Sequence, residues 1–345
     1  MRIERVCLAL PSRSLSSEDV IELIKEETER LGSFEGDLPK TLAMIRASLR
    51  RSGAKKRHWL APDESPLDLI RRACRNAMED IDPATIDLLL WASVDLAVVE
   101  PSTASLVAHM IGLDHVKCRD VKQACDGWMG AVEFADALIQ TERYRRIMIV
   151  NGEFGMVRGG MLYPRLFALK SPEELVWRFP SFTVGEAATA TIVGASSDEW
   201  KFSNRSRNDL YDLCTVSRPW PGYPITSERI GKDGPGHFTS YGSELRSHGL
   251  PLALETFNAS GIKTENVDIL FTHSSSKKDW RDAAKAVGLE NKLYDIYADC
   301  GNVVSAAIPA AMARAVEDDS LKRGMRVAAW VASAGMSFST VSFTY

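Results

Sequence analysis

Three side chains in this sequence form a set suited to acyl transfer: the thiol of Cys125, the imidazole of His273 and the amide of Asn302. Cys125 stands in DVKQACDGWMG, between an expected strand and an expected helix, which places its sulfur near the amino end of that helix. The dipole and free N–H groups at such an end stabilise a thiolate, the nucleophilic form of cysteine. The same N–H groups could also hold an oxyanion. A small buried cysteine without a chemical role is the alternative interpretation.

His273 and Asn302 each have a simpler interpretation when taken alone. His273 follows the apolar run VDILFT, and the carboxyl end of a buried strand is where open α/β sheets place their sites. A capping or core histidine is the alternative. Asn302 lies in a Gly-Asn turn before an alanine-rich helix, where turn and cap chemistry is usual. The three residues gain weight together, because a thiolate, an imidazole and an amide donor suit one reaction.

The elements that must position these residues alternate along the chain. Apolar runs predict strands at 1–10, 86–92, 116–123, 146–151, 187–195, 267–272, 325–332 and 338–344. Helical spacing predicts helices at 17–31, 66–81, 102–111, 127–142, 249–260, 278–287 and 304–316. This order predicts a layered α/β fold with a mostly parallel sheet, in two comparable halves. Residues 33–64 read as basic and irregular, and 199–248 as a lid or tunnel wall without clear periodicity.

Composition excludes several functional classes. The 345 residues hold 42 Lys and Arg against 46 Asp and Glu, a net charge of −4, so nucleic acid is not the expected partner. No apolar run approaches the ~20 residues of a membrane span, and the amino terminus does not read as a signal peptide. The six cysteines are scattered, which favours reduced thiols in a cytoplasmic protein. We expect no metal and no redox cofactor.

The motifs resemble those of the thiolase-fold condensing enzymes, specifically the β-ketoacyl-acyl-carrier-protein synthase III family. The family's Ala-Cys-x-Gly segment is matched by Ala124-Cys125-Asp126-Gly127, its strand-end histidine by His273, and its Gly-Asn run ending Ile-Pro by 301–309. Weaker similarities lie at 52–57, 184–188 and 334–336. The six segments occur in the family's order over almost the whole chain.

The resemblance implies an α/β thiolase fold, with two similar βαβαβ halves packed as a five-layer αβαβα sandwich. Residues 1–198 would carry the nucleophile, and 199–345 the histidine, the asparagine and the lid segment 199–248. It also implies a homodimer that uses acyl thioesters of an acyl carrier protein or of coenzyme A. Cys125 and Gly335 would supply the oxyanion N–H groups. We expect a basic stretch to meet the carrier: Arg46, Arg50, Arg51, Lys55, Lys56 and Arg57.

Some positions depart from the family pattern. The usual His-Gln-Ala-Asn is here 273–276, His-Ser-Ser-Ser, the terminal loop keeps only Gly335 of its glycines, and 1–58 contain no tryptophan to stack on coenzyme A. Glu100 stands where ordinary members place an aromatic gatekeeper. A glutamate there resembles the branch that joins two acyl chains head to head, where it acts as a base in the neighbouring subunit's site. A solvated carboxylate before a helix is the alternative.

The sequence therefore predicts a ketosynthase that joins two acyl thioesters by Claisen condensation through acyl-Cys125. His273 and Asn302 would stabilise the enolate, and a Glu100 with a pKa raised by an apolar tunnel would remove the α-proton. One alternative is decarboxylative condensation with a malonyl thioester, or acyl transfer to a small acceptor. Another is a non-catalytic partner subunit of a different ketosynthase.

Overall fold

Two five-stranded sheets form the centre of the computed structural model, which describes residues 1–218 and 227–345. The first contains β1 (Arg2–Ala9), β4 (Leu88–Trp91), β5 (Lys117–Asp120), β6 (Arg146–Glu153) and β7 (Ala187–Gly194). The second contains β8 (Lys201–Ser206), β11 (Ile269–Thr272), β12 (Leu293–Tyr294), β13 (Arg326–Ser333) and β14 (Ser337–Thr344).

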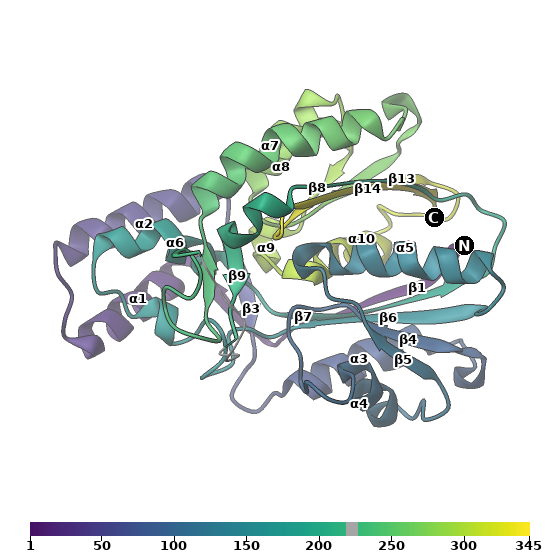
Figure 1. Ribbon diagram of the computed structural model, residues 1–345, viewed down its shortest axis with the longest axis horizontal. Coiled ribbons are helices and arrows are strands. Elements are labelled where there is room, and N and C mark those ends of the chain that lie inside the picture. The colour runs from purple at the N-terminus through teal and green to yellow at the C-terminus, as the bar shows by residue number, and fades with distance from the viewer. Residues whose placement is uncertain (219–226) are drawn as a thin grey trace.

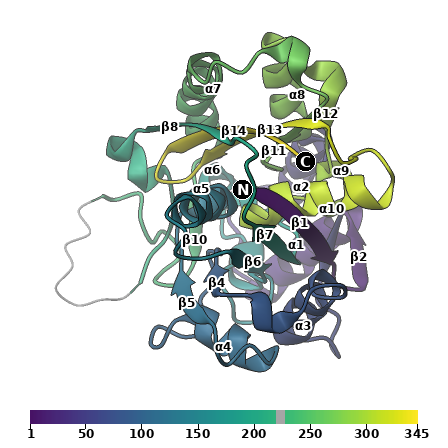
Figure 2. The ribbon, with the colours of Figure 1, turned by 90° about the vertical axis from the view of Figure 1, so that its right-hand side faces the viewer.

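Helices lie outside and between the sheets. The outer pairs are α3 (Pro66–Ala77) with α4 (Thr103–Met110), and α7 (Gly242–Ala259) with α8 (Lys277–Ala286). The central pair is α5 (Gly127–Gln140) and α10 (Ala307–Glu317). Figure 1 shows the resulting five layers, with α3 and α4 at the bottom and α7 and α8 at the top, and Figure 2 shows the same order from the side. The predicted five-layer sandwich is confirmed.

The two sheets share one topology. The strand orders are β1-β7-β6-β4-β5 and β8-β14-β13-β11-β12, so the strands of each half occur in the order first, fifth, fourth, second, third. In both, the first two pairings are antiparallel and the last two parallel. The expectation of a mostly parallel sheet is therefore wrong. β13 and β14 are joined by a short turn, and a connection that short forces antiparallel pairing.

The central helices are buried because their residues are small and apolar nearly all round. In α10 the residues from Ala307 to Ala313 are all buried, and α5 buries Trp128, Met129 and Val132. The alanines of α10 let the two sheets approach this layer closely. The turns Ala124–Asp126 and Val304–Ala306 lead directly into α5 and α10.

Two segments predicted to be irregular contain regular structure. Residues 33–64 hold α2 (Leu38–Ser52), capped by Asp37, and β3 (Lys56–Trp59), which pairs with β2 (Arg13–Ser16). Together with α1 (Ser17–Leu31) and α6 (Leu175–Arg178), α2 forms the lobe at the left of Figure 1. The many Arg and Lys residues of α2 made the helical spacing of its buried face hard to recognise in the sequence; that face consists of Leu42, Ile45 and Leu49.

The segment 199–248 contains β8, the short pair β9 (Cys214–Val216) and β10 (Phe238–Ser240), and the start of α7, which begins at Gly242 rather than 249. β8 gave no apolar signal because it is a largely exposed edge strand. Residues 219–226 of the predicted lid lie outside the described residues.

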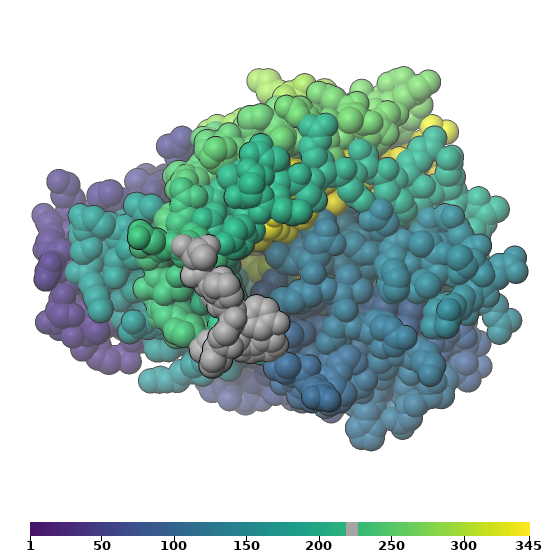
Figure 3. All heavy atoms as spheres, viewed as in Figure 1, coloured from purple at the N-terminus to yellow at the C-terminus, as the bar shows by residue number. Residues whose placement is uncertain are grey.

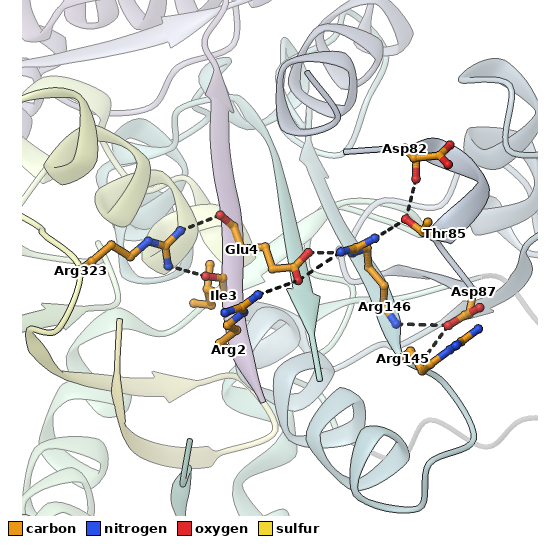
Figure 4. A network of polar contacts seen from close by, with 9 residues as sticks. All are labelled: Arg2, Ile3, Glu4, Asp82, Thr85, Asp87, Arg145, Arg146 and Arg323. Atoms are coloured by element: carbon orange, nitrogen blue, oxygen red, sulfur yellow. Dashed lines mark hydrogen bonds and ion pairs between the residues drawn. The ribbon is translucent and has the colours of Figure 1, made fainter. Parts of the chain in front are cut away.

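A polar network fastens the halves at the start of β6 (Figure 4). Arg146 donates to the carboxylate of Glu4 (2.7 Å), and Arg323 donates to the carbonyl oxygens of Ile3 (2.6 Å) and Glu4 (2.7 Å). This network ties the connection between α10 and β13 to β1. None of the helices in the described ranges is long and apolar enough to cross a membrane.

Candidate active site

A cavity of about 1290 Å³ is lined by residues of both halves, among them Cys125, His273 and Asn302. The structure therefore brings together the three residues that the sequence singled out. The segment after β8 contributes Cys214 and Thr215, and β10 contributes Phe238 and Ser240. Figure 3 shows the teal and green residues of this region lying against the blue first half.

Cys125 sits in a tight turn before the central helix α5. Ala124 has φ +47, a left-handed conformation that is uncommon for residues other than glycine, and a 3-10 turn spans Ala124–Asp126. The turn is held by Ser333, whose hydroxyl accepts from the N–H of Asp126 at 3.1 Å. Gly127 lies so close to Ala92 that a Cβ there would be 2.8 Å from its carbonyl oxygen. The sulfur is thereby fixed at the junction of the two halves.

The surroundings of Cys125 do not favour its thiolate as the sequence predicted. Burial raises the pKa of the thiol well above its ordinary value, and the nearby Cys214, Glu153 and Asp126 add to the rise. A hydrogen bond with Ser333 opposes it only partly. Desolvation thus outweighs the helix end, and the thiol needs a proton acceptor before it can attack.

His273 is the first residue after β11 and is buried, with 3 % of its surface exposed. Its backbone N–H donates to the carbonyl oxygen of Trp330 at 3.1 Å, which continues the pairing with β13 past the end of the strand. Nδ1 has no partner among the described residues. Burial lowers the pKa of His273 to about 4, opposed by a backbone hydrogen bond with Val304. The ring is therefore neutral at pH 7 and can donate one hydrogen bond.

Asn302 is held by backbone and side chain. Its N–H donates to Thr183 and its carbonyl oxygen accepts from Gly185, both at 2.9 Å. Its Oδ1 accepts from the N–H of Val304 at 2.9 Å, which leaves the Nδ2 group as a donor for the cavity. Gly301 has φ +68 and ψ −160, and a Cβ there would be 2.5 Å from the carbonyl oxygen of Thr183. The Gly-Asn pair is thus required by the close approach of these two backbone segments.

Two predicted site residues do not line this cavity within the chain. Glu100 is exposed, in the segment before α4. Gly335, with φ +91, forms the turn between β13 and β14 and lines an adjacent cavity of about 350 Å³. Its neighbour Met336 lines the main cavity, and Ala334 lines both.

The six basic residues predicted to meet a carrier separate into different roles. Arg57 is fully buried and donates to Ser17 (3.1 Å) and to the carbonyl oxygen of Phe182 (2.8 Å), so its assignment to docking is wrong. Arg46 pairs with Glu18 at 2.8 Å. Arg51 lines the cavity, where α7 and α8 add Arg246 and Lys278. Arg50, Lys55 and Lys56 are exposed.

Sequence reasoning missed three acidic residues that line the cavity, Asp95, Glu153 and Asp279, the last of which pairs with Arg246. Glu153 is the last residue of β6, and Asp95 follows β4 by four residues. The rule that identified His273, a polar residue at the carboxyl end of a buried strand, also applies to Glu153. Another buried carboxyl group, Glu186, accepts from Leu60 (2.7 Å) and Met156 (2.9 Å) outside this cavity.

Comparisons with known proteins agree with this architecture. Residues 257–345 match the family model described as 3-oxoacyl-[acyl-carrier-protein (ACP)] synthase III C terminal. OleA of Xanthomonas campestris, as a cysteine-to-serine variant with bound lauric acid and lauroyl-CoA, matches with TM-score 0.82 and 22% identity over 99% of this chain and 98% of that chain.

Two further OleA structures from Xanthomonas match in the same way. The cerulenin-bound form has TM-score 0.82 and 22% identity, covering 99% of this chain and 96% of that one. A glutamate-to-alanine variant has TM-score 0.81 and 22% identity, covering 99% and 97%.

The chain has the thiolase fold. The predicted resemblance to the synthase III family is confirmed for residues 257–345, the part that the family model matches. His273, Asn302 and the β13–β14 turn all lie within this segment. Within this thiolase fold, Cys125 comes from the other half of the chain and meets them at the shared cavity.

Proposed function

We propose that this protein is a ketosynthase that joins two acyl thioesters by Claisen condensation through an acyl group carried on Cys125. The observation that carries the proposal is the meeting of Cys125, His273 and Asn302 at one cavity in a thiolase fold. The residues that line the cavity extend from α2 to the β13–β14 turn, and an acyl chain needs such an extended cavity. No metal or redox cofactor has a step in this reaction.

The first step is acylation. The Cys125 sulfur attacks the carbonyl carbon of an acyl thioester, the C–S bond to the carrier breaks, and the carrier leaves as its free thiol. The developing oxyanion is held by the N–H of Cys125 and by the backbone of the turn that contains Gly335. The hydrogen bond from the N–H of Asp126 to Ser333 joins the Cys125 turn to the end of β13, next to the turn that contains Gly335.

The second step is carbon–carbon bond formation. A second acyl thioester loses an α-proton, and its enolate oxygen accepts hydrogen bonds from His273 and from the Nδ2 group of Asn302. A neutral His273 has a single N–H, so it donates to the enolate oxygen in exchange for its backbone bond with Val304, and it does so without becoming an acid that would quench the carbanion. The enolate carbon then attacks the acyl group on Cys125, and the sulfur leaves.

We assign removal of the α-proton to Glu100 of a second copy of the chain. Glu100 does not line its own chain's cavity, and it lies in an exposed segment in which Val99 is 63% exposed. An exposed valine beside an exposed carboxylate fits a surface that a partner subunit covers. OleA, which shares the fold, was also studied as glutamate-to-alanine and glutamate-to-glutamine variants.

We propose that the carrier approaches where α2, α7 and α8 surround the cavity. Arg51, Arg246 and Lys278 lie there beside the half-exposed Met44. Arg246 pairs with Asp279 at 2.7 Å and Lys278 pairs with Asp282, so a phosphate or an acidic carrier would compete with these carboxylates. A rim of cations around an apolar residue suits the phosphates of coenzyme A or the acidic surface of an acyl carrier protein.

The six cysteines, all of them among the described residues, form no disulfide, which fits a reducing, cytoplasmic location.

The test is incubation of the protein with saturated acyl-CoA thioesters of several lengths, with products analysed by mass spectrometry. We expect a β-keto product that contains both acyl chains, and none from a Cys125→Ala variant. Product only when malonyl-CoA is present, with release of CO2, would replace this reaction by decarboxylative condensation. Absence of any acyl group on Cys125 across the thioester series would favour a non-catalytic partner subunit.

A further inference from the structure

The buried acidic residues at the cavity have no role in the reaction described so far. Glu153 is 3% exposed, at the end of β6, and Asp95 is half-buried in the segment that follows β4. Both line the cavity that contains Cys125. Burying a carboxylate without a cation in contact with it is costly. The presence of two acidic side chains at this cavity therefore calls for an explanation.

Each carboxyl group is held in place from one side. Oε1 of Glu153 accepts from the N–H of Val94 at 3.1 Å and from the hydroxyl of Ser305. Oδ2 of Asp95 accepts from the N–H of Phe154 at 2.9 Å. Each segment thus donates to the other's carboxyl group, which places the two side chains together. The backbone of Ser305 also hydrogen-bonds the Glu153 carboxyl group, and Glu153 lines the cavity.

The partners of Glu153 also connect it to the catalytic turns. Ser305 lies three residues after Asn302 and accepts from the Nδ2 group of Asn151 at 3.0 Å. A Cβ on Gly127, two residues after Cys125, would lie 3.3 Å from the Cβ of Ser305. Glu153 is therefore braced by the same packing that holds Cys125 and Asn302.

We infer that the Asp95–Glu153 pair is the proton acceptor for Cys125 when its thiol attacks an acyl thioester. The inference rests on the proposed function, of which it concerns only the acylation step. The S–H bond breaks and its proton passes to the Glu153 carboxylate, while the sulfur electron pair forms the S–C bond. The C–S bond to the carrier then breaks, and the departing thiolate takes the proton, which returns the pair to its starting state.

Proton affinities support the pair over His273. Burial raises the pKa of Glu153 to about 8, and the charge of Asp95 adds to the rise. The pKa of Asp95 is raised too, although Phe154 and the exposed Lys122 oppose the shift. Because the pKa of the Cys125 thiol is also raised, an acceptor at about 8 matches it better than an imidazole at about 4. The other titratable groups close to the pair or the thiol are Glu186, Cys214 and Asp126.

The experiment measures single-turnover acylation of Cys125 by acyl-CoA, followed by intact mass as a function of pH. In the wild-type protein the rate should rise with an inflection near pH 8, because the Glu153 carboxylate must be free to accept the proton. Glu153→Gln should slow acylation about 100-fold and remove this inflection. Asp136→Asn is the matched control: it changes a buried carboxyl group of α5 that lies outside the cavity and is not among the charges acting on the pair or the thiol, so rate and profile should stay unchanged.

A second variant covers the case in which Glu153→Gln does not fold. Asp95→Asn removes the negative charge that raises the pKa of Glu153, so the inflection should move to lower pH in a protein that still acylates. Wild-type rates and an unmoved inflection in folded variants would overturn the inference while the proposed function stands. No acylation of the wild-type protein by any thioester would instead remove the proposed function itself.

Discussion

The two halves of the molecule share a strand order and pairing pattern but carry different chemistry at equivalent positions. The turn Ala124–Asp126 leads into α5, and the turn Val304–Ala306 leads into α10. Each turn begins with a left-handed residue, Ala124 at φ +47 and Val304 at φ +51. Cys125 in the first half therefore corresponds to Ser305 in the second.

The correspondence extends to the strand ends. His273 and Ala92 each follow the second strand of their half and donate a backbone N–H to the neighbouring fourth strand, to Trp330 and Val150 respectively. Ser333 and Glu153 each end the fourth strand and contact the opposite half's turn. The fold thus supplies two equivalent scaffolds, and in the proposed reaction the residue types decide that one half attacks while the other stabilises charge.

The strongest contrast is between the two equivalent turns. Cys125→Ala should abolish acylation, because the other described cysteine that lines the cavity, Cys214, lies in β9 rather than at a helix end, and burial raises the pKa of its thiol to about 11. Ser305→Ala should retain an acyl-enzyme, since Ser305 only braces Glu153. Intact mass after incubation with acyl-CoA distinguishes them. An acyl adduct of normal occupancy in Cys125→Ala would break the assignment of the first half as the nucleophilic one.

His273→Ala tests the division of labour between the halves. Removal of one oxyanion donor usually costs about 100- to 1000-fold, so condensation should fall by that factor while acyl-Cys125 accumulates. Product formation and intact mass, measured on the same sample, check both parts. Equal losses in acylation and condensation would mean that His273 serves the nucleophile rather than the enolate.

Asp126, the residue after Cys125, should make the free energy of unfolding depend on pH. Burial raises its pKa to about 7, with hydrogen bonds from Ser339 and Ser337 opposing. A raised carboxyl pKa stabilises the folded protein at pH below about 4, and this contribution is lost as pH rises through about 7.

In the wild type, ionisation of Asp126 should lower the free energy of unfolding by up to about 4 kcal/mol between pH 4 and pH 7. Asp126→Asn removes this ionisation, so the decline over that pH range should be smaller in the variant. Urea unfolding at a series of pH values measures this, with Glu142→Gln, an exposed carboxylate just after α5 that does not act on Asp126, as the comparison. A slope identical to that of the wild type would show that Asp126 is ionised throughout.

The Gly-Asn turn of the second half should be the more sensitive of two left-handed glycines. At Gly301 a side chain meets the Thr183 carbonyl oxygen at 2.5 Å in a conformation nearly confined to glycine, whereas Gly288, at φ +77, has open space around it. Gly301→Ala should cost about 2 kcal/mol more unfolding free energy than Gly288→Ala. Thermal melting of both variants gives the difference, and equal costs would contradict the close approach described.

The strands and helices with strong apolar runs could be predicted from the sequence, and with them the three residues that meet at the cavity. Cys125, His273 and Asn302 could be found because each follows or precedes such an element. β8 and α2 were missed because an exposed edge strand and a helix rich in surface cations carry little periodicity. Arg57 was misassigned because charge in a basic run does not reveal burial.

The electrostatic state of the site could not be read from the sequence. The helix end predicts a lowered thiol pKa, but the direction depends on how completely the folded chain removes water from the sulfur and on which carboxyl groups it brings near. Asp95 and Glu153 are 58 residues apart in sequence and become neighbours only through the packing of β4 beside β6.

The most direct test is to incubate the wild-type and His273→Ala proteins with one saturated acyl-CoA, such as lauroyl-CoA, and record both the mass of Cys125 peptides and the small-molecule products. The expected result is acyl-Cys125 in both proteins and a β-keto product containing two acyl chains from the wild type alone. Unmodified Cys125 together with no condensed product in the wild type, across a range of chain lengths, would contradict the proposed ketosynthase.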